Sequence, residues 1–184
     1  DKPEDKPFSI SSNTIINVPQ TWEKGYKGEG TVVAVIDSGL DVYHEVLRIS
    51  DPTKGKFKNQ TELEAAKKAA GIDYGKWYND KVVFAYDYMD GDDNIKEKDH
   101  DSHGMHVTGI ATGNPDKKAG DGNYVYGVAP EAQVMFMRVF SDKKGMTEQG
   151  FIVAKAVEDA VKLGADTINM SFGGVNGSEA DTNP

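Results

Sequence analysis

Two ionisable residues, Asp37 and His103, stand where their side chains could take part in chemistry. Asp37 directly follows an apolar run at residues 31–36, whose sequence is TVVAVI. A carboxylate at the end of a buried segment costs free energy unless hydrogen-bond donors reach it. Asp37 therefore either closes a tight turn together with Ser38 and Gly39, or it belongs to a functional site.

His103 begins a segment, residues 103–112, that is typical of a helix and that Asp101 or Ser102 could cap. A histidine at a helix N-terminus can act as a general base when a carboxylate holds its far ring nitrogen and stabilises the imidazolium. Asp37 could provide that carboxylate if the fold brings the two residues together.

His106 raises a second possibility, a metal-binding pair with His103, because residues three apart share a helix face. Zinc-binding histidines on a helix are usually four apart and have a Glu beside the first, and neither feature is present. We therefore favour a packed or hydrogen-bonded core position for His106. Gly104, between the two histidines, would allow another backbone segment or a substrate to approach closely.

The rest of the chain alternates between strand and helix patterns. Continuous apolar, β-branched runs predict strands that are buried on both faces. The predicted strands are residues 31–36, 81–88, 132–140 and 166–170, and the predicted helices are a short one after Pro19, then 61–70, 103–112 and 147–163. This order predicts an α/β fold, a parallel sheet with helices on both faces. Ligands of such folds bind beyond the carboxyl ends of the strands, where Asp37 is expected to lie.

Two local expectations can be compared directly with a structure. The residues from 8 up to the short helix after Pro19 are expected to form a polar lead-in. The helix at 147–163 should end at Gly164 and bury one apolar stripe. The members of that predicted stripe are Phe151, Ala154, Val157, Ala160 and Val161.

Composition narrows the class of protein. The chain has 184 residues, enough for one domain with a hydrophobic core, and its net charge of −9 argues against a nucleic-acid or anionic-membrane partner. Without cysteine it can hold no disulfide and no Cys-based zinc site. No apolar run approaches the ~18 residues of a membrane span, and no signal peptide is visible, so residues 1–7 are expected to be a trimmed start.

Four sequence motifs resemble those of one enzyme family. Residues 33–39 (VAVIDSG) resemble the aspartate motif of the subtilisin-like serine proteases, the subtilases, and residues 101–110 (DSHGMHVTGI) resemble their histidine motif. Residues 126–132 (YGVAPEA) resemble the turn after the histidine helix, and residues 166–174 (DTINMSFGG) resemble the strand that lines the substrate cleft. The motifs occur in the family's order and span roughly residues 18–176.

The resemblance implies roles for the matching residues. Asp37 would orient His103, which would be the general base toward a serine and the general acid toward the leaving amine. The substrate, a protein or peptide, would bind as an added extended strand. The residues implied on one wall of its primary pocket are Ser171, Phe172 and Gly173, and those implied on the opposite wall are Gly145 and Met146.

The family's oxyanion-hole Asn and nucleophilic Ser lie C-terminal to the stretch that matches residues 171–174, and this chain ends at Pro184. We therefore expect a missing C-terminal portion, or a partner chain, to carry them. Losing the nucleophile of such a triad costs on the order of a million-fold in rate, so the chain alone is predicted to be inactive. A non-catalytic protein-binding fragment that retains the fold is the alternative.

An insertion separates the Asp and His motifs. Residues 1–184 are predicted to belong to a single domain unit. Within it, the insertion at residues 48–86 resembles that of Gram-positive cell-envelope proteinases of the C5a-peptidase and lactocepin types, and Met105 points to the same group. That resemblance implies a secreted or wall-anchored parent that cuts extracellular proteins.

No cofactor is expected to be required for catalysis, whereas a structural calcium ion is possible because subtilases often bind one through oxygen ligands. An acidic loop holds Asp90, Asp92, Asp93, Asp99 and Asp101. These residues could hold a cation, but such a loop is more often simply solvated, so we assign no metal ligands.

Overall fold

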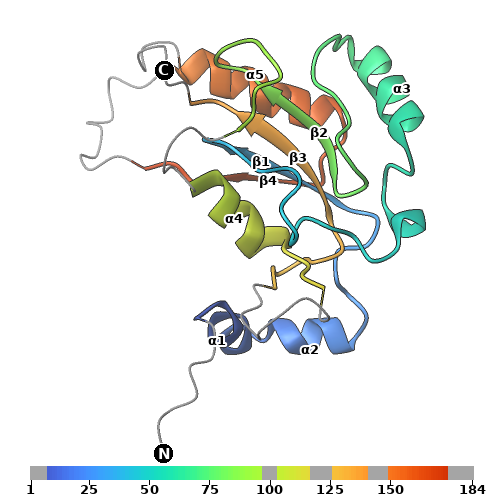
Figure 1. Cartoon of the computed structure of the whole chain (residues 1–184), viewed down its shortest axis with the longest axis vertical. Coiled ribbons are helices and arrows are strands. Elements are labelled where there is room, and N and C mark those ends of the chain that lie inside the picture. Colours follow the sequence, from blue (N-terminus) through green and yellow to red (C-terminus); the bar gives the residue numbers. More distant parts are fainter. Residues whose placement is uncertain (1–7, 97–102, 117–125, 141–148, 174–184) are drawn as a thin grey trace, which may run out of the picture.

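The computed structural model describes residues 8–96, 103–116, 126–140 and 149–173 (Figure 1). The elements run in the order α1 (Phe8–Ile15), α2 (Val18–Glu23), β1 (Val32–Asp37), the 3-10 helix η1 (Pro52–Lys54), α3 (Gln60–Ala70), β2 (Val82–Asp87), α4 (His103–Thr112), β3 (Gln133–Arg138), α5 (Gln149–Lys162) and β4 (Thr167–Met170). Each predicted strand and helix is therefore present, with ends that differ by up to two residues.

The four strands form one parallel sheet in the order β2-β3-β1-β4. β1 lies in the centre and pairs with β3 and with β4, and the Cα atoms of Asp37 and Arg138 are register partners at the ends of β1 and β3. Asp87, which ends β2, is also a register partner of Arg138. Because the strands are parallel, their carboxyl ends meet at one edge of the sheet, and these three charged residues meet there.

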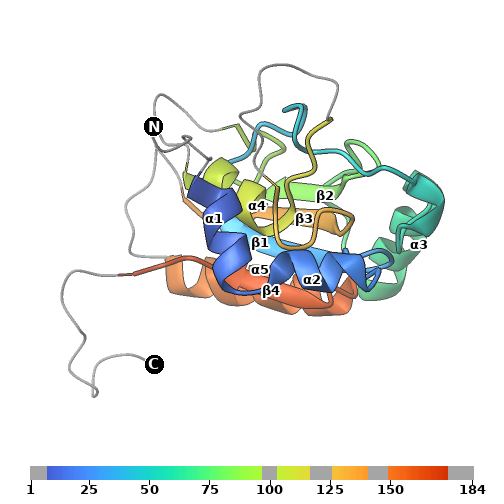
Figure 2. The ribbon, with the colours of Figure 1, turned by 90° about the horizontal axis from the view of Figure 1, so that it is seen from below.

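Helices cover both faces of the sheet, as predicted, and Figure 2 shows α4 on one side and α5 on the other. Alternate residues of β1 point to opposite faces. Val33 and Val35 pack in the cluster that includes Met105 and Val107 of α4. The other face of β1 packs with Ala156, Ala160 and Leu163 of the α5 segment and with Leu63 of α3. The α/β fold class is confirmed.

The insertion packs into the same core as the sheet. Gln133, fully buried at the start of β3, accepts a hydrogen bond from Phe57 N (2.9 Å) and donates through Nε2 to Phe57 O (2.8 Å) and Asp80 O (2.9 Å). On the α5 side, Tyr74 Oη donates to the fully buried Asp159 Oδ2 at 2.5 Å. These contacts place the insertion against the sheet, on the face that α5 covers.

One local expectation is wrong and another holds only in part. A helix, α1, occupies part of the expected polar lead-in. The helix α5 ends before Gly164 as expected, and Val157 and Ala160 of the predicted stripe pack on the core. The rest of the buried side is formed by Ala156, Asp159 and by Leu163 just after the helix, whereas Phe151 is 84% and Val161 is 64% exposed. The helix carries apolar residues over a wide arc, so its periodicity is compatible with several faces. Packing against the sheet selects among them, and the sheet was not available to the sequence argument.

Candidate active site

Asp37 and His103, 66 residues apart in the chain, are in direct contact. Asp37 is the last residue of β1 and His103 is the first residue of α4. His103 Nδ1 lies 2.7 Å from Asp37 Oδ1, and the Asp37 side chain is 1% exposed whereas the imidazole is 51% exposed. The contact that the sequence predicted is thus present. It joins a buried carboxylate to a ring that solvent or a ligand can reach.

Ser38 joins the strand end to the helix start. Its backbone N–H donates to Asp37 Oδ1 (2.8 Å), and its Oγ accepts a hydrogen bond from Gly104 N (3.2 Å). Gly104 is required by this close approach, since a Cβ atom there would lie 2.4 Å from the backbone oxygen of Gly39. The predicted close backbone approach at Gly104 is therefore confirmed.

The arrangement fixes the chemistry available to the imidazole. An ionised Asp37 accepts the Nδ1 proton, which leaves Nε2 as the basic nitrogen and stabilises the ring when it becomes an imidazolium. Asp37 Oδ2 is also buried, and within the described parts of the chain it has no hydrogen-bond partner. The half-exposed ring is therefore equipped to accept and return a proton.

A buried ion pair that the sequence argument missed lies beside this contact. Arg138 and Asp87, with side chains 4% and 0% exposed, are joined by a 2.8 Å contact between Arg138 Nη1 and Asp87 Oδ2. Burial raises the pKa of Asp87 above its usual range, and hydrogen bonds from Asp90 N and Arg138 offset this only in part. The available signal was an arginine within a predicted strand in which Gln133 is the other polar residue.

The predicted substrate-binding residues Ser171, Phe172 and Gly173 follow β4 and are exposed. The ring of Phe172 lies 5.6 Å, centroid to centroid, from that of Phe140, which follows β3. These residues thus lie beyond the carboxyl ends of the two strands that flank β1. Their role in binding stays a prediction. Gly145 and Met146, predicted for the opposite wall, lie outside the described residues.

The prediction for His106 is wrong, because His106 is exposed and not a core residue. In the described ranges, no group of three or more His, Asp or Glu residues could hold a metal ion. Asp99 and Asp101 lie outside those ranges, and a structural calcium ion stays a prediction. Among the described helices, none has the length and apolar character of a membrane span.

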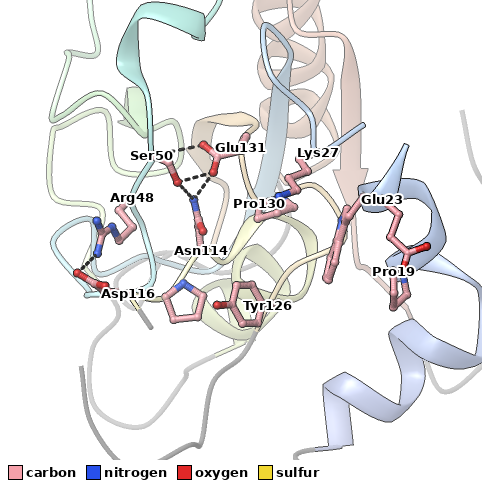
Figure 3. Close-up of a pocket in the computed structure, with 12 residues that line it drawn as sticks. Pro19, Glu23, Lys27, Arg48, Ser50, Asn114, Asp116, Tyr126, Pro130 and Glu131 are labelled. Carbon is pink, nitrogen blue, oxygen red and sulfur yellow. Dashed lines mark hydrogen bonds and ion pairs between the residues drawn. The ribbon is translucent and has the colours of Figure 1, made fainter. Parts of the chain in front are cut away.

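A separate cavity of about 700 Å³ lies at the opposite edge of the sheet, before β3 and after α4 (Figure 3). Its polar groups largely bind one another. Glu131 accepts hydrogen bonds from Ser50 N, Ser50 Oγ and Asn114 Nδ2, and Arg48 pairs with Asp116 at 2.7 Å. Burial alone would raise the pKa of Glu131, but these hydrogen bonds hold it below its usual range. No local sequence pattern predicted this cavity, because its walls come from well-separated segments.

Known proteins resemble this chain over most of its length. Residues 28–183 match the subtilase family, peptidase S8. The chain is 45% identical over 152 residues to a C5a peptidase of Streptococcus pyogenes, an alignment that covers 82% of this chain and 13% of the relative. It is 40% identical over 184 residues to a PII-type proteinase of Lactococcus lactis subsp. cremoris, covering 97% of this chain and 9% of the relative. The chain therefore spans only a small part of the length of these curated relatives.

Solved structures share the fold. MycP1 from Mycobacterium smegmatis superposes with a TM-score of 0.54 at 22% identity, over 90% of this chain and 36% of that one. The Clostridium perfringens CspB protease gives a TM-score of 0.54 at 19% identity, over 87% of this chain and 33% of that one. With an Asp–His contact at the carboxyl edge of a parallel sheet and with these sequence matches, the chain belongs to the subtilase family.

Proposed function

We propose that this chain supplies the Asp and the His of the Asp-His-Ser triad of a subtilisin-like serine endopeptidase. The observation that carries the proposal is the 2.7 Å contact between the buried Asp37 carboxylate and Nδ1 of the half-exposed His103. A structural ion pair would have no need to leave the ring accessible at the edge of the sheet where ligands of α/β folds bind. Membership of the subtilase family supports the same role.

In this mechanism His103 Nε2 takes the proton of a serine hydroxyl while the serine Oγ bonds to the carbonyl carbon of the scissile peptide. Asp37 stays ionised and stabilises the imidazolium. His103 then gives the proton to the leaving nitrogen as the carbon–nitrogen bond breaks, which leaves an acyl-enzyme. A water molecule attacks the ester in the same way, and the acid product and the serine are released.

The substrates would be proteins or peptides that bind in an extended conformation beyond β4. Ser171, Phe172 and Gly173 support this proposal, because they are exposed and lie beyond the carboxyl end of the strand beside β1. Their backbone groups can hydrogen-bond to an added strand. Gly145 and Met146 are proposed for the facing wall of the primary pocket.

The serine and the oxyanion-hole Asn would come from a C-terminal portion of the same protein, continuous with this chain or held as a second chain. In the described sheet, β4 pairs with β1 alone, and its Met170 is 48% exposed. Edge strands with free backbone groups tend to acquire a further partner. Phe151 and Val161 of α5 are also exposed apolar residues. We expect the serine-bearing portion to cover β4 and these residues, and this chain alone to be inactive.

The parent enzyme is proposed to act outside the cell, secreted or anchored to the wall, on extracellular proteins. The 45% identity to an enzyme named for the peptide C5a supports this proposal. The net charge of −9 and the lack of cysteine are compatible with it.

The test uses the complete protein, with the serine-bearing portion present, and compares two histidine substitutions on one helix. His103→Ala should lower kcat for a peptide substrate on the order of a million-fold and abolish labelling by a fluorophosphonate probe. His106→Ala is the matched control, because His106 lies on the same helix and is exposed. It should leave both measurements unchanged.

Hydrolysis and labelling that persist in the His103→Ala protein would exclude His103 as the general base. A complete protein that has no serine-bearing portion, is never labelled and binds a host protein tightly would instead support a non-catalytic binding module. Mass spectrometry of everything that co-purifies with this chain distinguishes these cases.

A further inference from the structure

The end of β3 carries an arginine that the proposed proton transfer does not use. Arg138 is 3% exposed in a strand whose other side chains, apart from Gln133, are apolar. A guanidinium in such a place costs several kcal/mol of desolvation free energy unless its hydrogen bonds are satisfied. Its position beside both Asp37 and Asp87 in the sheet register directs its side chain across the carboxyl edge.

The guanidinium binds three different segments. Arg138 Nε donates to the backbone oxygen of Ser38 at 2.6 Å, and Nη1 donates to Asp87 Oδ2 at 2.8 Å and to Asn94 O at 3.3 Å. Asp87 is itself held, because its Oδ1 accepts hydrogen bonds from Met89 N and Asp90 N at 2.9 Å each. The ion pair thus links the turn after β1 to the loop after β2.

Ser38 is the residue through which this link reaches the Asp–His contact. The same residue donates its N–H to Asp37 Oδ1 and accepts from the second residue of α4, Gly104. The Ser38 N–H therefore holds the Asp37 carboxylate, its Oγ holds the start of α4, and its carbonyl oxygen binds Arg138. A shift of the Ser38 peptide would move both partners of the 2.7 Å contact.

We propose that Arg138 is a positioning residue for the Asp37–His103 pair, acting through the Ser38 carbonyl and held in place by Asp87. This inference rests on the proposed function of that pair. A lysine could replace the charge but not the forked guanidinium group, since one ammonium group cannot reproduce the planar geometry by which Arg138 binds Ser38 O and Asp87 together. Arg138→Lys therefore keeps the net charge but weakens the hydrogen bond that holds the Ser38 carbonyl.

The experiment compares Arg138→Lys, Asp87→Asn and Arg48→Lys in the complete enzyme. Because Arg138 does not contact the reacting atoms, Arg138→Lys should lower kcat by about 10-fold to 100-fold with KM nearly unchanged, as misplacement of a catalytic group does. The acid limb of the kcat/KM profile should move to lower pH, because a looser Asp37 stabilises the imidazolium less. A merely structural role would leave that limb in place.

Asp87→Asn should change kcat in the same direction but by less, since Arg138 keeps its bond to Ser38. It also serves as the deciding variant if Arg138→Lys does not fold. Arg48→Lys is the matched control: its partner Asp116 is a half-exposed residue at the opposite edge of the sheet, and kcat, KM and the pH profile should not change.

The pKa of His103, followed through its ring proton signals by NMR, separates this inference from the proposed function. A titration that moves to lower pH in Arg138→Lys supports the positioning role whether or not the enzyme turns over. A folded Arg138→Lys protein, or a folded Asp87→Asn protein where only that one folds, with unchanged His103 titration and unchanged kcat would overturn it. If His103→Ala retains activity but the Arg138 variant shifts the titration, the proposed function fails while the inference stands.

Discussion

The amino ends of the parallel strands form one edge of the sheet, here the amino edge, and their carboxyl ends form the other, the carboxyl edge. Both edges bury ionisable groups, but these groups have different surroundings. At the amino edge, Lys81 is 1% exposed and donates to Pro130 O at 2.7 Å, and Glu131 is surrounded by Ser50 and Asn114. At the carboxyl edge, the buried Asp37 binds an imidazole that is half exposed. The amino-edge groups bind one another and other buried groups, whereas His103 keeps one face toward solvent.

This difference separates a structural polar network from a site equipped for reaction. Burial alone marks both edges, and the cavity of about 700 Å³ lies at the amino edge, away from the Asp–His contact. A buried charge whose partners are all internal has a structural role only, while a buried charge that orients an accessible base can act on a ligand. Solvent exposure of one partner therefore distinguishes the reactive site from the structural network better than burial does.

The largest expected effect is at the carboxyl edge, in Asp37→Asn. The amide can still accept a hydrogen bond from Ser38 N, but it cannot stabilise the imidazolium and it favours the wrong His103 tautomer. We expect kcat of the complete enzyme to fall about 10⁴-fold while its melting temperature changes little. A loss of activity below 10-fold would remove the distinction between the two edges.

Gly104→Ala tests how tightly the carboxyl edge is packed. The added Cβ would lie 2.4 Å from Gly39 O and 2.9 Å from Gly39 N, and backbone atoms cannot move aside cheaply. We expect a loss of about 1–3 kcal/mol in the free energy of unfolding, together with reduced kcat. Gly109→Ala on the same helix is the control, since nothing lies within 4 Å of its Cβ position. That variant should be neutral or stabilised by up to about 1 kcal/mol, and equal behaviour of the two variants would contradict the close packing.

The smallest expected effect is at the amino edge, in the pH dependence of stability. Burial, partly offset by Glu131, lowers the pKa of Lys81 to about 7 in the folded protein, whereas the pKa of this lysine in the unfolded chain is about 10.4. The unfolded state then binds more protons between these two pH values, so Lys81 makes the free energy of unfolding rise with pH in that window. Lys81→Met should flatten this rise by up to about 1.4 kcal/mol per pH unit, without changing kcat.

Denaturant unfolding of the complete enzyme at several pH values measures the slope. Lys24→Met, at an exposed lysine, should leave it unchanged. If the free energy of unfolding of Lys81→Met changes with pH as it does in the parent protein, Lys81 stays charged in the folded state across this pH window. The expected depression of its pKa by burial would then be wrong.

Much of the fold and the central contact could be predicted from the order of local signals. The continuous apolar run before Asp37, the Gly residues that end α3 and follow α5, and the segment opened by His103 each determine local backbone structure within a few residues. Alternating strands and helices then favour a parallel sheet, because each helix can supply the crossover connection that parallel strands need. That arrangement brings strand ends and helix starts to one edge.

The sequence could not determine features that depend on which faces meet. The wide apolar arc of α5 allowed several buried faces, and the Arg138–Asp87 pair joins residues 51 apart. His103 and His106 are both exposed, and His103 is the one that contacts Asp37. The sequence by itself thus determined the elements, their order and the family motifs, since these follow from local periodicity and residue type. Only the tertiary structure decided which side chains are buried together, because burial and hydrogen-bond partners depend on the packing of distant segments.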